Sequence, residues 1–276
     1  MKNKNYRFID LFAGCGGLSL GLEQAGFKPV LFSELNESAA ATYRANRTEE
    51  EYPGLKNIRD VHEIKDKDIK QFKNIDLVCG GPPCQGYSAI GIRRTHKADK
   101  KDMARNQLFN EMVRIVKEVE PKLFLFENVR GILTGKWTEE HKGKIFDDVL
   151  GTFQEYLDDK YHIRWNLLKS SSYGVPQNRP RVFIVGVKKT LTYANKIEPK
   201  KRNEIREKGF AIDDGFLPEP NGMVPPDLID LLDDLNDKDW KKNYITEKYP
   251  KDAKNKIQKE MRARKNDEDN YIGINK

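Results

Sequence analysis

Arg7-Phe8-Ile9-Asp10-Leu11-Phe12-Ala13-Gly14-Cys15-Gly16-Gly17 is the stretch that decides the fold of this chain. Its apolar first half, 7–12, is typical of a buried parallel strand, and the glycine-rich half, 13–17, predicts a tight turn. Apolar residues then recur at helical spacing from Leu18 to Ala25. Strand, glycine turn and helix in this order predict an open α/β sheet of dinucleotide-binding type, with helix N–H groups offered to a ligand.

A second strand, predicted over 29–33, ends at Glu34, which lies 20 residues after Gly14. An acid at that distance in such a fold hydrogen-bonds ribose hydroxyls. The match to GxGxxG is imperfect because Ser19 stands where the third glycine would be. The pattern indicates a cofactor that contains adenosine. The alternative, plain tight turns between elements, explains the glycines but leaves Glu34 unexplained.

Composition limits the class of protein. The 276 residues suffice for one large α/β domain, or one domain with an appendage, and the hydrophobic content of 37% and charged content of 34% are typical of a soluble protein. The net charge of +7 and the pI near 9.0 favour a polyanionic partner. The alternative is a merely solvated basic surface.

The cysteines and the apolar runs exclude several classes. Three cysteines, without a CxxC motif or a His/Cys cluster, predict neither a disulfide framework nor a metal site. No apolar run approaches membrane-spanning length, and no signal peptide is recognisable at the start. We expect a cytoplasmic protein.

The stretch Val78-Cys79-Gly80-Gly81-Pro82-Pro83-Cys84-Gln85-Gly86-Tyr87-Ser88 carries the candidate chemistry. A short apolar strand, predicted over 75–79, ends in two glycines and two prolines that restrict the backbone, and Cys84 follows on the loop. This is where open α/β sheets hold ligands, and an ionised thiol is a strong nucleophile. The alternative is that Cys84 is one more small buried residue.

Other candidate residues follow predicted strands. Asp60 lies in the predicted strand 57–61 and is a candidate for the adenine edge, although alone it favours a capping role. Glu127 follows the strand predicted over 122–126, after a helix over 106–118, and partial burial there would raise its pKa. The alternative is a carboxylate that caps the next turn. Arg179 and Arg181 flank a proline before the strand predicted over 182–187, where they can meet a planar acceptor or a phosphate. The alternative is plain surface.

These segments, with Glu127-Asn128-Val129 and Gln177-Asn178-Arg179-Pro180-Arg181, resemble the ordered motifs of the cytosine-C5 DNA methyltransferases over roughly residues 6–188. The resemblance implies an S-adenosylmethionine-dependent fold, with a mostly parallel seven-stranded sheet whose last strand is antiparallel. It also implies double-stranded DNA as substrate.

The resemblance assigns roles to the candidate residues. The Cys84 thiolate adds to C6 of cytosine, Glu127 engages N3, and Arg181 binds O2 with support from Arg179. Because this geometry is impossible inside a stacked duplex, the base must be flipped out. The basic stretch 93–101 corresponds to the mobile catalytic loop of the family, and the implied DNA contacts are Gln85, Ser88, Arg93 and Arg94. Without the resemblance, a charged stretch of this kind predicts a solvated loop.

For the cofactor, the resemblance implies a cradle for methionine and adenosine, with Glu34 on the ribose, Leu35 packed on adenine, and Asp60 with Val61 at its edge. Leu35 replaces the bulky aromatic residue often found there, which predicts weaker stacking. Asn128 is expected to orient the Pro-Cys turn. The remaining cradle residues are Phe12, Gly14, Gly16, Gly17, Leu18, Pro82 and Leu108.

After residue 188 the sequence departs from the family pattern, since we find neither a target-recognition domain nor the two motifs that flank it. We expect a catalytic domain over 1–188, a connector over 189–238, and over 239–276 a charged tail or the start of a truncated recognition region. The hypotheses are a cytosine methyltransferase, within a restriction-modification system and helped by a second subunit, or a non-catalytic cofactor- or DNA-binding remnant. A tRNA cytosine methyltransferase is disfavoured because the chain has no Cys-Phe-Thr motif.

Overall fold

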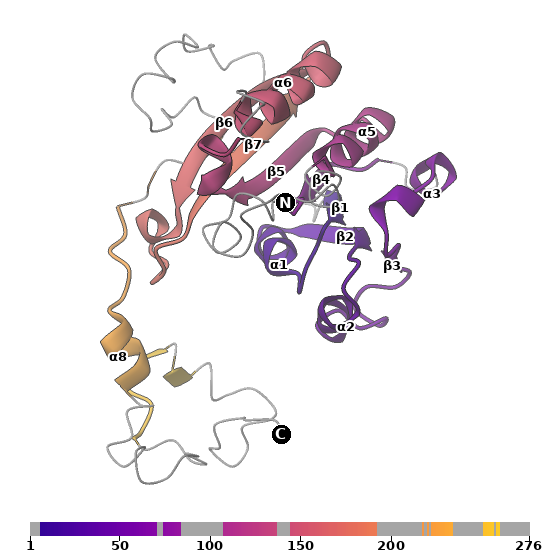
Figure 1. Ribbon diagram of the computed structural model, residues 1–276. Coiled ribbons are helices and arrows are strands. Elements are labelled where there is room, and N and C mark those ends of the chain that lie inside the picture. Colours follow the sequence, from indigo (N-terminus) through magenta and orange to yellow (C-terminus); the bar gives the residue numbers. More distant parts are fainter. Residues whose placement is uncertain are drawn as a thin grey trace. The chain divides into compact units, whose positions relative to one another are not determined.

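The computed structural model describes residues 6–70, 74–83, 107–136, 144–191, 217, 220, 222–233, 251–256 and 258–259. The chain divides into two compact units, one formed by 1–168 with 180–219 and the other by 169–179 with 220–276. The first unit holds the sheet that the sequence predicts (Figure 1).

Within the described residues, seven strands form one sheet in the order β3-β2-β1-β4-β5-β7-β6. β1 pairs in parallel with β2 and β4, β2 pairs in parallel with β3, and β4 pairs in parallel with β5. β7 runs antiparallel to β5. This mixed α/β sheet confirms the predicted fold class. The strands are β1 Tyr6–Leu11, β2 Phe27–Ser33, β3 Lys56–Asn57, β4 Leu77–Gly80, β5 Leu123–Val129, β6 Tyr161–Lys169 and β7 Pro180–Lys188.

Alternating side chains divide the sheet into two faces. Ile9, Val78 and Phe124 belong to the large core cluster, which includes side chains of α3, α5 and α6. Phe8 and Leu77, one residue away on their strands, pack instead with residues of α1. Helices therefore cover both faces of the central strands, which is why these strands place apolar side chains on both faces (Figure 1). The helices of this unit are α1 Gly17–Gln24, α2 Glu37–Ala45, α3 Asp66–Lys70, α5 Phe109–Val119 and α6 Ile145–Leu157.

α5 shows how the sequence pattern produces its element. Its apolar residues recur at helical spacing, and Met112, Ile115 and Val116 are fully buried against the sheet. Glu120 ends the helix in a left-handed conformation at φ 47°, and Pro121, which cannot continue a helix, follows.

Several predicted boundaries differ from those of the structure, and two of the differences change where a candidate carboxylate lies. β5 continues to Val129 because β7, distant in sequence, extends the ladder by pairing Phe183 with Glu127. Glu127 therefore lies within the strand and not after it. β3 ends at Asn57, because the Asp60 side chain accepts a hydrogen bond from the His62 N–H and turns the chain into a short 3-10 helix over Val61–Glu63. α3 has no counterpart among the predicted elements.

In the second unit, Ser170–Tyr173 forms a 3-10 turn and Leu228–Leu232 forms the short helix α8, capped by Asp227. Gln258 donates to the carbonyls of Asp230 and Leu231 at the end of α8. Lys251 and Lys254 both pair with Asp233. Part of the lysine-rich segment is thus attached to the stretch predicted as a connector.

Candidate active site

The loop after β1 turns sharply, and its first residue, Phe12, lines a cavity. Phe12 has φ 58°, Gly14 has φ 55° and Gly16 has φ 89°, so the chain turns sharply through left-handed conformations. For Phe12, which has a Cβ, such a conformation costs on the order of 1 kcal/mol and is held by the surrounding structure. α1 begins at Gly17, directly after this turn.

Glu34 fixes the opposite side of the loop. One carboxylate oxygen accepts a hydrogen bond from the Gly14 N–H at 2.8 Å, and the other accepts one from the Asn36 N–H at 2.7 Å. The acid at the end of β2 is therefore oriented by the glycine turn and by the N-terminus of α2. This explains the spacing of 20 residues that the sequence shows.

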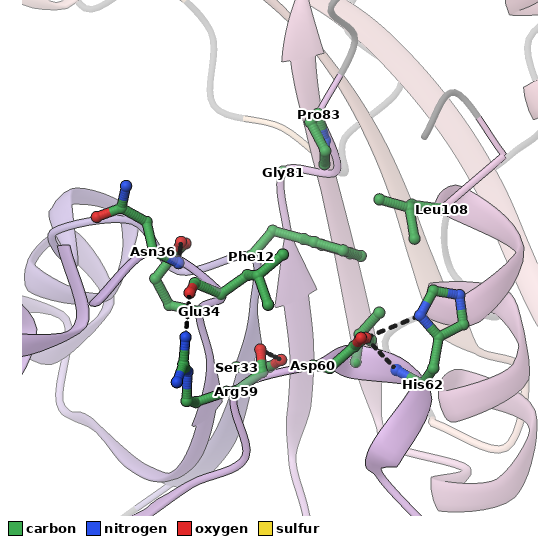
Figure 2. A pocket seen from close by; sticks show the side chains of 12 residues that line it. Phe12, Ser33, Glu34, Asn36, Arg59, Asp60, His62, Gly81, Pro83 and Leu108 are labelled. Atoms are coloured by element: carbon green, nitrogen blue, oxygen red, sulfur yellow. Dashed lines mark hydrogen bonds and ion pairs between the residues drawn. The ribbon is translucent and has the colours of Figure 1, made fainter. Parts of the chain in front are cut away.

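These residues line a cavity of about 720 Å³. Figure 2 shows Glu34, Asn36 and Arg59 on one side of it and Leu108 and His62 on the other, with Gly81 and Pro83 at one end. The wall is mostly apolar with a few polar groups, which is typical of a small-molecule site. The lining residues are Phe12, Ser33, Glu34, Leu35, Asn36, Arg59, Asp60, Val61, His62, Gly81, Pro83 and Leu108.

Asp60 is held in place at this cavity by its neighbour His62. One oxygen of Asp60 accepts from the His62 backbone N–H at 3.0 Å and lies 2.8 Å from Nδ1 of the His62 ring. The hydrogen bond from the His62 backbone is the main reason why the pKa of Asp60 lies below its ordinary value. The carboxylate is therefore ionised at neutral pH and ready to accept a hydrogen bond from an amino group.

Of the predicted cofactor residues, Phe12, Glu34, Leu35, Asp60, Val61 and Leu108 line the cavity. Gly14 donates its N–H to Glu34, whereas the other predicted residues are not part of the lining; these are Gly16, Gly17, Leu18 and Pro82. The lining also includes Ser33, Asn36, Gly81 and Pro83, which were not predicted to bind the cofactor. Sequence reasoning also missed two polar residues of the wall, Arg59 and His62. Their position on either side of Asp60 was the available signal.

A buried polar network lies beneath the glycine turn. Asp10, which is fully buried, accepts a hydrogen bond from Ser19 Oγ, and Ser19 Oγ lies 2.8 Å from the Tyr43 hydroxyl. Burial raises the pKa of Asp10 to about 6, although the hydrogen bonds from Ser19 and Cys79 oppose that rise. Burial also raises the pKa of the Cys79 thiol. A neutral buried thiol is a poor nucleophile, so Cys79 packs and does not react.

The candidate catalytic acid lies on the first unit. Glu127 Oε1 is 2.8 Å from Arg181 Nε, on neighbouring strands β5 and β7. Gly81 lies directly against it, since a Cβ built on Gly81 would stand 3.0 Å from Glu127 Oε2. Gly81 also lines the cavity. The carboxylate, the guanidinium and the cavity therefore meet at one place on the sheet edge.

The Pro-Pro turn is tied to the same strand. The Asn128 side chain donates to the Pro82 carbonyl at 3.1 Å, which is the orienting contact expected for Asn128. Cys84, Gln85, Ser88, Arg93 and Arg94 lie outside the described residues. Pro83 is the last described residue before Cys84, so the start of its loop is placed at the cavity.

Arg179 belongs to the second unit, where its carbonyl accepts a hydrogen bond from the Ser170 N–H at 3.3 Å. Within the described residues no group of three or more His, Cys, Asp and Glu side chains could hold a metal ion. None of the helices in the described part of the chain is both long and apolar enough to cross a membrane.

Comparison with known proteins extends the likeness over nearly the whole chain. A family model described as C-5 cytosine-specific DNA methylase matches residues 6–275. The type II methyltransferase M.XorII of Xanthomonas oryzae pv. oryzae is 34% identical over 249 residues, which cover 88% of this chain and 50% of that protein. The type II methyltransferase M1.ScrFI of Lactococcus lactis subsp. cremoris is 40% identical over 186 residues, covering 67% of this chain and 42% of that protein.

A solved structure gives the same result for the fold. A prophage-encoded Escherichia coli protein, described as a candidate DNA modification methyltransferase, superposes with a TM-score of 0.62 at 28% identity. The superposition covers 92% of this chain and 63% of that one. The chain spans about half the length of M.XorII and M1.ScrFI. The match of the family model to residues 6–275 covers nearly the whole chain, and the chain belongs to the C-5 cytosine-specific DNA methylase family.

Proposed function

We propose that this chain transfers a methyl group from S-adenosylmethionine to C5 of cytosine in double-stranded DNA, through a covalent bond between Cys84 and C6. The observation that carries the proposal is that Gly81 both lines the cavity and lies against Glu127. A base held by Glu127 would therefore stand next to the donor of the methyl group.

The cavity fits the proposed cofactor. The Glu34 carboxylate, fixed by two backbone N–H groups, is placed to accept hydrogen bonds from ribose hydroxyls. Asp60 can accept a hydrogen bond from the adenine amino group, and Phe12, Val61 and Leu108 supply apolar surface for the purine. S-adenosylmethionine, when bound, supplies an electrophilic methyl group on its sulfonium.

The residues of the chain supply the rest of the chemistry. Cytosine C5 is a poor nucleophile, so the Cys84 thiolate first adds to C6 and raises the electron density at C5. Glu127 engages N3 and Arg181 binds O2, which stabilises the charge that develops on the ring. Loss of the C5 proton after transfer lets the bond from sulfur to C6 break and frees Cys84.

The ion pair between Glu127 and Arg181 adds a requirement. A carboxylate paired with a guanidinium is not a proton donor, so a proton must reach Glu127 when cytosine enters. Turning of Arg181 towards O2 would remove the charge that opposes this proton. We therefore infer that binding of the flipped base and protonation of Glu127 are coupled.

The biological setting is also part of the proposal. Relatives named as type II methyltransferases support a place in a restriction-modification system in the cytoplasm. Arg179, Gln85, Ser88, Arg93 and Arg94 would contact DNA around the target. A second polypeptide that reads the target sequence is a further proposed partner.

The test is covalent trapping on DNA that contains 5-fluorocytosine at random sequence positions. Fluorine replaces the proton that must leave C5, so an adduct through Cys84 would persist and would survive denaturing electrophoresis. We expect an adduct that needs S-adenosylmethionine and disappears in Cys84→Ser, and sequencing of the trapped DNA would give the recognition site. The trial is run with and without the product of the neighbouring gene. If the chain binds the cofactor but forms no adduct in either trial, the result would contradict the proposed methyltransferase activity. It would then favour the non-catalytic cofactor- or DNA-binding remnant.

A further inference from the structure

Arg59 is the charged residue of the cavity wall that the proposed function leaves without a role. It follows the short strand β3 and directly precedes Asp60, and it lines the cavity together with Leu35. Its side chain is about half exposed, at 54%. In Figure 2 it lies on the same side of the cavity as Glu34.

The guanidinium of Arg59 is held in a defined position. Nη1 pairs with Glu37 Oε1 at 2.9 Å, and Nη2 donates to the Leu35 carbonyl at 3.2 Å. Both acceptors belong to the segment after Glu34, so this contact joins the end of β3 to the start of α2. A long side chain that would otherwise sample many rotamers is thereby restrained at the wall of the cavity.

The same bonds determine what the guanidinium can offer. Its two terminal nitrogens each use one in-plane N–H group, on Glu37 and on the Leu35 carbonyl, and neither bond occupies a planar face of the guanidinium. A guanidinium face binds planar rings by stacking and by cation–π attraction, and nucleic-acid bases are ring partners of this kind. A lysine at this position would lack such a face, because its ammonium group is not planar.

The neighbours of Arg59 place a purine beside it. Asp60 would hold the edge of the ring at its amino group, and Val61 and Phe12 supply apolar wall. On the side of α2 the wall contains Leu35, which is 64% exposed and offers an aliphatic side chain. Leu35 alone is a poor cover for an aromatic ring.

We propose that Arg59 is a binding residue for the cofactor, with its guanidinium stacked on the adenine face beside Leu35. The proposal rests on the proposed function, since it takes S-adenosylmethionine as the ligand of this cavity. It adds a second contact with the base: Asp60 reads the edge of adenine, and Arg59 covers its face. Affinity for the nucleoside part of the cofactor thus depends on the ion pair between Arg59 and Glu37.

The experiment is calorimetric titration of the full chain with S-adenosylhomocysteine, which has the same nucleoside and needs no turnover. We expect Arg59→Ala to weaken binding about 5- to 20-fold, in the range of a cation–π contact that loses water. Arg59→Lys should recover less than half of that loss on a logarithmic scale, because it keeps the charge without the plane. Arg130→Ala, which removes an exposed arginine outside the cavity lining, is the matched control and should stay within about twofold of the wild type.

A double variant separates stacking from a purely structural role. Leu35→Trp combined with Arg59→Ala restores a ring contact but neither bond of Arg59 to Leu35 or Glu37. Recovery of affinity would support stacking, and no recovery would mean that Arg59 acts by holding the loop, which overturns the proposal. The inosine analogue of the ligand adds a check, since Arg59→Ala should weaken both ligands equally while Asp60→Ala should reduce the preference for adenine.

Failure of the inference is distinguishable from failure of the proposed function. If the wild type binds S-adenosylhomocysteine and Arg59→Ala binds it equally well, Arg59 is a surface residue and the inference alone is overturned. If the wild type does not bind the ligand, the assignment of the cavity fails, and the inference fails with it.

Discussion

At the scale of single residues, the position of Gly81 links cofactor and base. The residue has no side chain, and the Glu127 carboxylate lies so close that a Cβ on Gly81 would stand 3.0 Å from its Oε2. Glu127 is in turn held by Arg181 across the β5–β7 ladder. Gly81 and Arg181, from different parts of the sequence, thus both contact the candidate acid.

Gly81→Ala should therefore lower turnover more than cofactor affinity. The added methyl group would stand 3.0 Å from Glu127 Oε2, so the carboxylate must move. Because catalysis depends on alignment, we expect kcat to fall about 10- to 100-fold. Gly151→Ala on α6, where a Cβ meets nothing within 4 Å, is the control and should leave kcat unchanged. Equal loss of methylation by both variants in a tritium-transfer assay would contradict this account.

At the scale of elements, side chains in and after α2 hold the glycine turn between β1 and α1. Arg47, after α2, pairs with Glu23 of α1 at 2.7 Å, and its guanidinium lies 3.9 Å from the centre of the Tyr43 ring. Both side chains approach Gly16 so closely that a Cβ there would lie 2.7 Å from Arg47 and 2.8 Å from Tyr43. Gly16 is thus required by its neighbours as well as by its positive φ.

Asp10, which accepts a hydrogen bond from Ser19 beneath the glycine turn, makes the free energy of unfolding depend on pH. Since the pKa of Asp10 rises from its ordinary value of 3.8 to about 6 in the fold, the folded state binds this proton more tightly than the unfolded state. The resulting stabilisation is fully present below pH 3.8 and is lost as pH rises through 6. Asp10→Asn removes this dependence. Between pH 5 and pH 7.5 the free energy of unfolding should shift in favour of the variant by roughly 1 kcal/mol.

Urea titrations of the wild type and Asp10→Asn at both pH values would measure that shift. The comparison uses the change with pH, so a constant penalty from the altered hydrogen bond with Ser19 does not affect it. A difference that is the same at both pH values would show that Asp10 keeps an ordinary pKa in the fold.

The antiparallel pair β5–β7 depends on a glycine opposite an aromatic ring. Gly186 is registered with Phe124, and a Cβ on Gly186 would lie 1.9 Å from the Phe124 ring. Gly186→Ala should therefore displace a fully buried ring that also stacks on Phe153. We expect a loss of about 3 kcal/mol in the free energy of unfolding, measured by urea titration. If Gly186→Ala combined with Phe124→Leu is no more stable than Gly186→Ala alone, the ring is not the cause.

At the scale of the whole molecule, net charge bears on the proposed substrate. The chain carries a net charge of +7, which favours association with polyanions. Each phosphate contact lowers the logarithm of the affinity for DNA by about 0.9 per tenfold rise in salt concentration. With as few as two such contacts, affinity should fall about tenfold between 50 and 200 mM salt. Fluorescence anisotropy with a labelled duplex would test this, and an affinity independent of salt would contradict a contact through phosphates.

The division into two units was outside the reach of sequence reasoning. Residues 169–179 group with 220–276 in the structure, and the catalytic domain expected over 1–188 stays a prediction. Arg179 and Arg181, two residues apart, therefore belong to different units. A sequence pattern shows which segments are apolar, but it carries no record of which distant segments pack together.

The sequence by itself determined the class of fold and the family, and it predicted half of the residues that line the cavity. Short-range patterns suffice for these, because strand, glycine turn, helix and terminal acid are fixed by local backbone preferences and by spacing along one βαβ unit. Only the tertiary structure decided that Glu127 lies within β5, that it pairs with Arg181 against Gly81, and that Arg59 stands at the cavity wall. Each of these depends on contacts between segments that are far apart in sequence or on where a side chain turns. Such contacts are set by long-range packing. The stretch from Arg7 to Gly17 could therefore predict a cofactor site, but it could not predict which side chains from other segments form the rest of the wall.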